Sequence, residues 1–306
     1  MKIYNNILEL TGKTPMVRLS KLEEKYGLNV RLIAKLEMFN PSGSIKIRPA
    51  KNMMEKALEE KLINQDTIII EPTSGNMGIA FALVCRVMGL KFIAVMPSNM
   101  SLERQKLIKA YGGEIVLTET KFGMDGAVKK ALELQKELNG FIPSQFENKY
   151  NPLAHLETAK EIYSDTLGNV DIVVCGVGTG GTISGIGRYL KAIKDIKMIS
   201  IEPGESPLIS SGVSGAHKIQ GIGANFIPHN LDINVIDKVI PVLSSESFEM
   251  MRELGLTEGI FAGISSGAAL SGTIKYIKEN NVKDKTVVVI LPDTGERYLS
   301  MDLGYE

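Results

Sequence analysis

The chain has 306 residues, of which 44% are apolar and 23% charged, and its 35 basic and 35 acidic residues give a formal net charge of zero. This composition is that of a globular protein of one or two domains, and it lacks the basic surplus that a nucleic-acid partner favours. Apolar stretches fall short of the ~18 residues of a membrane span, and the first residues lack a secretion signal, so we expect no membrane and a cytoplasmic location. Cys85 and Cys175 lie in apolar segments, which predicts buried free thiols.

Short apolar runs alternate with helical patterns along the chain. Strands are predicted over residues 31–36, 67–71, 91–96, 114–117, 171–175, 197–202, 238–242 and 286–291. Helices are predicted over residues 50–60, 78–88, 102–111, 125–138, 152–167, 182–193, 245–254 and 268–279. The strands are nearly continuously apolar, which is typical of parallel strands buried on both faces. The alternation indicates an α/β protein with open, mostly parallel sheets and flanking helices.

In such sheets ligands bind beyond the carboxyl ends of the strands, so the turns from strand to helix are the places to look for a site. Residues 176–182 (GVGTGGT) follow one predicted strand and open a helix. Glycines allow close backbone approach, and a helix start offers free N–H groups, so a bound phosphate is the preferred interpretation. The same loop fits G-x-G-x-x-G with Glu202 about 20 residues on, so by itself it also allows a dinucleotide site.

Three further loops combine polar side chains with a turn. Residues 40–49 (NPSGSIKIRP) place Lys46 at a predicted helix start, where the positive end of the helix dipole favours the neutral amine that a Schiff base needs. Residues 71–78 (EPTSGNMG) offer hydroxyls and N–H groups to a carboxylate. Residues 291–297 (LPDTGER) follow the last strand. Residues 263–267 (GISSG) match a hydrolase elbow, but all three histidines precede Ser265, so we interpret this segment as a turn into a helix.

Together and in this order, these loops resemble those of the cysteine synthase (O-acetylserine sulfhydrylase) and cystathionine β-synthase family, which are pyridoxal-phosphate enzymes of fold type II, with a tryptophan synthase β-like fold. Residues 10–15 (LTGKTP), 145–148 (QFEN) and 217–224 (HKIQGIGA) extend the resemblance over nearly the whole chain. It implies pyridoxal 5'-phosphate as cofactor and a homodimer. It also implies a large cofactor-binding domain of residues 1–38 and 148–306, and a smaller, mobile substrate-binding domain of residues 39–147.

The resemblance also implies roles for single residues. Lys46 would bind the cofactor aldehyde as a Schiff base and act as the catalytic base. The cofactor phosphate would be held by the glycine-rich loop, namely Gly178, Thr179, Gly180, Gly181 and Thr182. Asn76 would bond the ring hydroxyl, and Thr294 would face the pyridine nitrogen. The substrate carboxylate would be bound by Thr73, Ser74 and Gln145. A hydroxyl at the nitrogen cannot keep it protonated, which favours elimination at Cβ over long-lived carbanions.

The implied reaction is β-replacement on a three-carbon amino acid through an aminoacrylate, with O-acetyl-L-serine and sulfide giving L-cysteine. Met77 and Asn225 depart from the family pattern, which has threonine and, in sulfhydrylases, glycine at these positions. Asn225 could contact the leaving group or the nucleophile, and Asp232 could act as a base or be a solvated loop carboxylate. The alternative reaction consumes L-cysteine and releases hydrogen sulfide, with water giving L-serine or a second cysteine giving lanthionine.

Overall fold

The computed structural model describes residues 3–73 and 75–304, and the chain divides into two compact units. The smaller unit comprises Met1–Thr11 and Asn40–Asn151, and the larger unit comprises Gly12–Phe39 and Pro152–Glu306. Met1–Thr11 belongs to the smaller unit, whereas the predicted division places residues 1–38 in the larger domain. The functions assigned to the two domains stay predictions.

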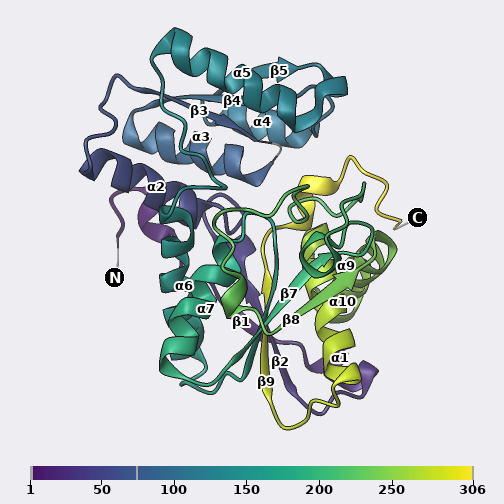
Figure 1. Ribbon diagram of the computed structural model, residues 1–306. Coiled ribbons are helices and arrows are strands. Elements are labelled where there is room, and N and C mark those ends of the chain that lie inside the picture. The colour runs from purple at the N-terminus through teal and green to yellow at the C-terminus, as the bar shows by residue number, and fades with distance from the viewer. Residues whose placement is uncertain (1–2, 74, 305–306) are drawn as a thin grey trace. The chain divides into compact units, whose positions relative to one another are not determined.

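The smaller unit is built on a parallel sheet of three strands in the order β3-β4-β5. The strands are β3 (Ile68–Pro72), β4 (Lys91–Pro97) and β5 (Glu114–Thr118). The helices are η1 (Ile7–Leu10), α2 (Ile47–Glu59), α3 (Asn76–Met88), α4 (Leu102–Ala110), η3 (Thr120–Phe122) and α5 (Gly123–Leu138). Figure 1 shows α3 and α4 on one side of these strands and α5 on the other.

Strands β3 and β4 are buried on both faces, since successive side chains of a strand point to opposite faces. Ile69 and Phe92 pack into the apolar cluster formed with α2 and α3, and Ile70 and Val95 pack into the cluster formed with α5. The strands therefore read as continuous apolar runs in the sequence, as the prediction required.

The larger unit is built on a sheet of six strands in the order β1-β2-β9-β6-β7-β8. The strands are β1 (Met16–Arg18), β2 (Arg31–Leu36), β6 (Ile172–Gly176), β7 (Lys197–Pro203), β8 (Lys238–Val242) and β9 (Thr286–Leu291). The strand pairs are parallel apart from the antiparallel edge pair β1 and β2. The expected class, α/β with open, mostly parallel sheets, is confirmed.

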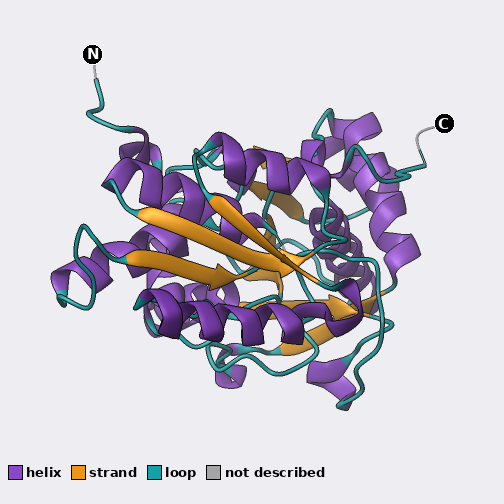
Figure 2. Ribbon diagram, turned by 90° about the horizontal axis from the view of Figure 1, so that it is seen from above, coloured by secondary structure: helices purple, strands orange, loops and turns teal. Residues whose placement is uncertain are grey.

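Helices cover both faces of the larger sheet. They are α1 (Ser20–Tyr26), η2 (Glu37–Phe39), α6 (Tyr150–Asp165), α7 (Gly181–Ile193), α8 (Leu208–Ser211), η4 (Ile233–Val235), α9 (Ser244–Glu258), α10 (Ile264–Glu279) and η5 (Gly295–Tyr298). In Figure 1, α6 and α7 lie on one side of the sheet and α1, α9 and α10 on the other. Figure 2 shows the same layering from above, with the strands between helices. Cys85 and Cys175 are free and buried, as predicted, and burial raises the pKa of both thiols.

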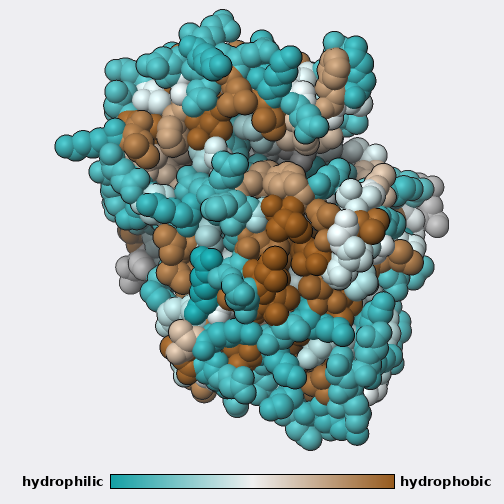
Figure 3. All heavy atoms as spheres, in the orientation of Figure 1, coloured by the Kyte–Doolittle hydropathy of each residue, from teal (hydrophilic) through white to brown (hydrophobic). Residues whose placement is uncertain are grey.

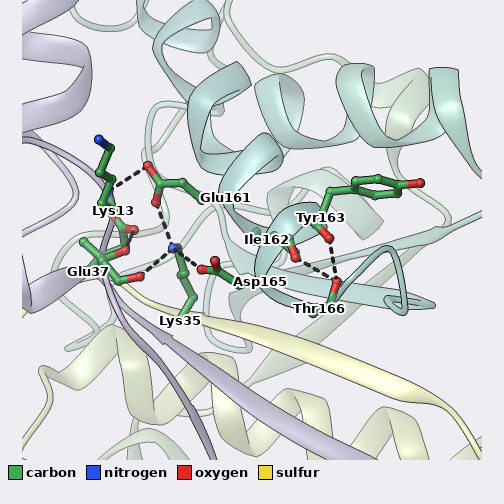
Figure 4. A network of polar contacts seen from close by, with 9 residues as sticks. Lys13, Lys35, Glu37, Glu161, Ile162, Tyr163, Asp165 and Thr166 are labelled. Carbon is green, nitrogen blue, oxygen red and sulfur yellow. Dashed lines mark hydrogen bonds and ion pairs between the residues drawn. The ribbon is translucent and has the colours of Figure 1, made fainter.

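A buried lysine joins β2 to α6 within the larger unit (Figure 4). The Lys35 side chain is fully buried, and its Nζ lies 2.8 Å from Glu161 Oε2 and donates to the carbonyl oxygen of Thr14 at 2.7 Å. Asp165 lies farther from the ammonium, at 3.9 Å. The Thr14 hydroxyl donates to the buried carboxylate of Glu37 at 2.6 Å. These contacts hold the chain before β1 against α6.

Candidate active site

The glycine-rich loop joins β6 to α7 in the larger unit. α7 begins at Gly181, and its N-cap Gly180 has φ +80°, a conformation that L side chains rarely adopt. A Cβ at Gly180 would lie 2.7 Å from Leu231 Cα, and a Cβ at Gly178 would overlap the carbonyl oxygen of Gly221. The loop therefore needs glycine at both positions, and the N-terminus of α7 supplies N–H groups that the helix itself does not use.

Two threonines of this loop add hydroxyl groups to it. Thr179 is 6% exposed, and the Thr182 hydroxyl lies 3.4 Å from His155 Nε2. His155 is buried on α6, and its Nδ1 lies 3.2 Å from the Thr158 hydroxyl. The helix start, the glycines and these hydroxyls form the kind of site that binds a phosphate group.

The loop after β9 starts at the same edge of the sheet, because β6 and β9 are parallel neighbours. Thr294 is partly buried, and its hydroxyl accepts a hydrogen bond from Glu296 N at 3.3 Å as the N-cap of η5. An isolated antiparallel bridge pairs Thr294 with Ala262, so the start of α10 lies beside this loop.

Ser265 is a candidate beyond the site residues predicted from the sequence. It is 3% exposed on the first turn of α10, and its hydroxyl lies 3.6 Å from the place a Cβ would take at Gly221. Gly221 itself packs against the glycine-rich loop at Gly178. The G-x-S-x-G pattern was the available signal, and it was interpreted only as a turn into a helix, which the structure bears out.

In the smaller unit, Lys46 occupies the N-cap position of α2. Its side chain makes no capping hydrogen bond, and its backbone N–H donates to the Ser44 hydroxyl at 3.4 Å. Lys46 is partly buried, while its neighbours Ile45 and Ile47 are fully or nearly fully buried. The two isoleucines anchor the chain on either side, so the lysine is held at the positive end of the α2 dipole.

The loop between β3 and α3 carries a second set of predicted site residues. Thr73 is 2% exposed, and its hydroxyl accepts a hydrogen bond from Gly75 N at 3.3 Å. Asn76 is partly buried on the first turn of α3, whereas Met77 points into the apolar core of the unit. The predicted carboxylate ligand Ser74 lies outside the described residues. The guanidinium carbon of the buried Arg104 lies 3.2 Å from the place a Cβ would take at Gly75.

Gln145 lies next to this loop in the same unit. It is 7% exposed, and its backbone N–H donates to Glu71 Oε1 at 3.1 Å. Its carbonyl oxygen accepts from the Asn151 side chain at 2.7 Å, and its own side-chain amide is 3.5 Å from the Pro72 carbonyl. The structure therefore brings Gln145 beside Glu71 near the end of β3, and Glu71 lies two residues before Thr73 in the chain.

The other two predicted substrate contacts, Asn225 and Asp232, differ in their surroundings. Asn225 is exposed in the segment after Gly223. The Asp232 carboxylate binds Arg188 Nε at 2.7 Å and accepts from Asn234 N at 3.2 Å as the N-cap of η4, and these contacts hold the pKa of Asp232 below its usual range. Both of its oxygens are engaged within the larger unit, and a role of Asp232 as a base or substrate contact stays a prediction.

A dinucleotide site at the glycine-rich loop would need Glu202 to bind a ribose. Glu202 is 2% exposed at the end of β7, where its carboxylate accepts from Ile209 N at 2.7 Å and from the backbone and hydroxyl of Ser210. Glu202 thus caps α8 and is not presented to a ribose. No group of metal-binding side chains and no helix able to cross a bilayer is found in residues 3–73 and 75–304.

Comparison with known proteins decides between the remaining interpretations. The family described as pyridoxal-phosphate dependent enzyme matches residues 7–293. The chain belongs to this family. Cysteine synthase B of Campylobacter jejuni is 49% identical over 306 residues, covering 99% of both chains. An O-acetyl serine sulfhydrylase of Entamoeba histolytica has a TM-score of 0.96 and 41% identity, covering 100% of this chain and 92% of its own. A hydrogen sulfide-producing enzyme of Fusobacterium nucleatum has a TM-score of 0.93 and 42% identity, covering 97% of this chain and 100% of its own.

The residues of this pyridoxal-phosphate enzyme fit the cofactor of its family. The loop of Gly178 and Gly180 is a cradle that a Cβ would fill, at a helix N-terminus suited to a phosphate dianion. The buried hydroxyl of Ser266, next to Ser265 on the first turn of α10, has no hydrogen-bond partner among the described residues. A buried hydroxyl without a partner is costly, so a ligand that bonds it would be favoured.

Proposed function

We propose that this protein is a cysteine synthase, which replaces the acetoxy group of O-acetyl-L-serine by sulfide to give L-cysteine and acetate. The observation that carries the proposal is the similarity to cysteine synthase B, at 49% identity over 99% of both chains. The substrates are therefore a small amino acid and sulfide. Pyridoxal phosphate, when bound, supplies the electron sink that weakens the Cα–H bond and the bond to the β-substituent.

Lys46 is the proposed catalytic residue. Its amine would hold the aldehyde of the bound cofactor and, when free, would take the proton from Cα of the substrate. The position of Lys46 at the start of α2, between two buried isoleucines, supports this role because the amine is held in place and its neutral form is favoured.

The remaining residues bind and orient. The loop of Gly178, Thr179, Gly180, Gly181 and Thr182 binds the cofactor phosphate, with the N-terminus of α7 opposing its negative charge. Asn76 would bind the hydroxyl group on the cofactor ring. Thr73, Ser74 and Gln145 bind the substrate carboxylate, with the N-terminus of α3 favouring the anion.

A hydroxyl group faces the pyridine nitrogen in this proposal, and two positions compete for the role. Thr294 is the residue that the resemblance indicates, and the bridge between Thr294 and Ala262 lies beside the helix that carries Ser265. Thr294→Ala and Ser265→Ala distinguish them, because loss of the bond to the nitrogen shifts the absorbance of the bound cofactor. We expect one variant to shift the spectrum and the other to leave it unchanged.

The activity test uses the purified holoenzyme with each substrate set. O-acetyl-L-serine and sulfide should give L-cysteine, and L-cysteine alone should release sulfide at a much lower rate. Lys46→Ala should abolish both reactions. The alternative function is supported by the similarity to a hydrogen sulfide-producing enzyme and by the exposed Asn225. Sulfide release from L-cysteine without L-cysteine formation would favour it, and Asn225→Gly should then reduce that release.

The assembly state and the location belong to the same proposal. A homodimer is supported by the exposed apolar side chains of the larger unit, since contiguous exposed apolar surface is typical of interfaces. Figure 3 shows apolar surface on the face of this unit that is turned to the viewer. Light scattering of the purified protein should give twice the mass of the 33.4 kDa chain. The two free, buried thiols support a cytoplasmic location.

A further inference from the structure

Glu71 is a buried carboxylate that the proposed mechanism does not use. It is 1% exposed at the end of β3, and its two oxygens accept hydrogen bonds from successive backbone N–H groups, Ser144 N at 3.1 Å and Gln145 N at 3.1 Å. In residues 3–73 and 75–304, Glu71 forms no ion pair. A buried carboxyl group is therefore held by main-chain donors from a segment more than 70 residues away in sequence.

The backbone of that segment is shaped around the carboxylate. Ser144 has φ +59°, which is unfavourable for a residue with a side chain and persists where its surroundings fix it. A residue in this conformation turns successive N–H groups toward one point and so forms a small anion-binding nest. Phe141 is anchored just before it, since it exchanges backbone hydrogen bonds with Ile68 and Ile70 of β3. Two sets of contacts therefore bind this segment to β3, namely the backbone hydrogen bonds of Phe141 and the hydrogen bonds to the Glu71 side chain.

The same strand end carries the predicted carboxylate-binding loop. Glu71 and Thr73 are two residues apart, so their side chains lie on the same face of an extended chain. Thr73 N continues the strand pairing by donating to Val95 O at 2.9 Å, which fixes the Thr73 side chain relative to Glu71. Gln145, bound by Glu71, therefore lies beside Thr73.

We propose that Glu71 is a positioning residue for the donor amino acid, since it fills the nest at Ser144 and Gln145 and so sets the Gln145 amide beside Thr73 to receive the substrate carboxylate. The inference rests on the proposed function, in which Thr73 and Gln145 bind that carboxylate. Glu71 does not touch the substrate. It acts through Gln145, and its two carboxylate oxygens accept from both N–H groups at once.

The test compares two donors in wild-type and Glu71→Gln holoenzymes. Gln has nearly the same volume, but its NH₂ group faces one of the two N–H donors, so the nest loses a hydrogen bond. One donor is O-acetyl-L-serine, and the other is its carboxamide, which lacks the charged carboxylate. We expect kcat/KM for the carboxylate donor to fall at least about tenfold, through KM, while the value for the carboxamide changes little. The ratio of the two values therefore falls, whereas a purely structural loss would lower both alike.

Three further variants make the result specific. Glu71→Asp keeps the charge but withdraws it by one methylene group, so it should shift the ratio in the same direction and by less. Glu71→Gln in a Gln145→Ala background should add no further loss, because both substitutions remove the same contact. Asp171→Asn is the matched control: Asp171 accepts from Thr286 N at 2.9 Å at the starts of β6 and β9 in the larger unit, and its loss should leave the ratio unchanged.

The outcomes separate this inference from the function on which it rests. An unchanged ratio in Glu71→Gln and Glu71→Asp, in an enzyme whose wild type makes L-cysteine, overturns the role of Glu71 alone. Equal losses for both donors, or additive losses in the Gln145→Ala background, do the same. A wild-type holoenzyme that uses neither donor overturns the proposed function and this inference with it. The absorbance of the bound cofactor, measured without substrate, should be the same in all variants.

Discussion

At the scale of single residues, the glycine-rich loop depends on the absence of two side chains. Gly180→Ala adds a Cβ at φ +80° and 2.7 Å from Leu231 Cα, so we expect it to lower the free energy of unfolding by about 2–4 kcal/mol and to weaken cofactor binding. Gly259→Ala is the control, since Gly259 has φ +72° with nothing within 4 Å of its would-be Cβ, and it should cost only about 1 kcal/mol. Urea unfolding and cofactor titration measure both; equal costs would contradict the steric argument.

Glu71 gives a prediction for the pH dependence of stability. Burial raises its pKa from 4.5 to about 7, against the opposing effect of the bonds from Gln145 and Ser144. The folded protein therefore holds this proton more tightly than the unfolded chain does. The protonated Glu71 contributes its full share of the unfolding free energy below pH 4.5, and this contribution is lost as the pH rises through about 7. Compared with Glu71→Gln, the wild type should lose about 3 kcal/mol of unfolding free energy across this range. A difference between the two proteins that does not vary with pH, in urea unfolding from pH 4.5 to 8, would contradict the prediction.

Residue types and their spacing were sufficient for some of these features. Lys46 and the loop glycines follow from local rules about helix starts and tight turns, which a sequence displays directly. The bonds of Glu71 to residues 144 and 145 join positions 73 and 74 residues apart, and Arg188 reaches Asp232 across 44 residues. Such contacts depend on how the chain folds back on itself, so they cannot be predicted from the local sequence pattern.

At the scale of elements, long buried elements were predicted well and short exposed ones were not. The structure has β2 at Arg31–Leu36 and β8 at Lys238–Val242, with the bounds predicted from their apolar runs. β1 and α1 were missed because three and seven residues are too few to display a period, and β1 is largely exposed at the sheet edge. The loops after β3, β6 and β9 could still be placed at strand ends from the sequence, because they follow buried strands.

The buried Lys35 tests what joins β2 to α6. Lys35→Ala leaves Glu161 and the Thr14 carbonyl without their fully buried partner, so we expect the free energy of unfolding to fall by about 3 kcal/mol. Lys160→Ala is the control on the same helix, because its pair with Glu157 is exposed, and it should change stability little. Urea unfolding of the two variants checks the comparison. Similar losses of unfolding free energy in the two variants would contradict a larger contribution from the buried pair.

At the scale of the whole molecule, cofactor binding should stabilise the fold. A ligand that binds only the folded protein raises its stability by mass action, so apoprotein should unfold at a lower temperature than holoprotein. Pyridoxal 5'-phosphate should restore the unfolding temperature, and pyridoxal without the phosphate should restore much less of it, because the glycine-rich loop then has no anion to bind. Thermal unfolding followed by circular dichroism measures this. Equal recovery with both compounds would show that the loop after β6 is not the phosphate site.

The bond between Lys46 and the cofactor is the claim on which the account of the whole molecule depends. Borohydride reduces a Schiff base to a stable amine, so reduced holoenzyme can be digested and its peptides mapped by mass spectrometry. We expect the peptide containing Lys46 to carry the mass of the reduced cofactor and the other lysine peptides to be unmodified. A modification on another lysine, or no modified peptide from a yellow preparation, would contradict it.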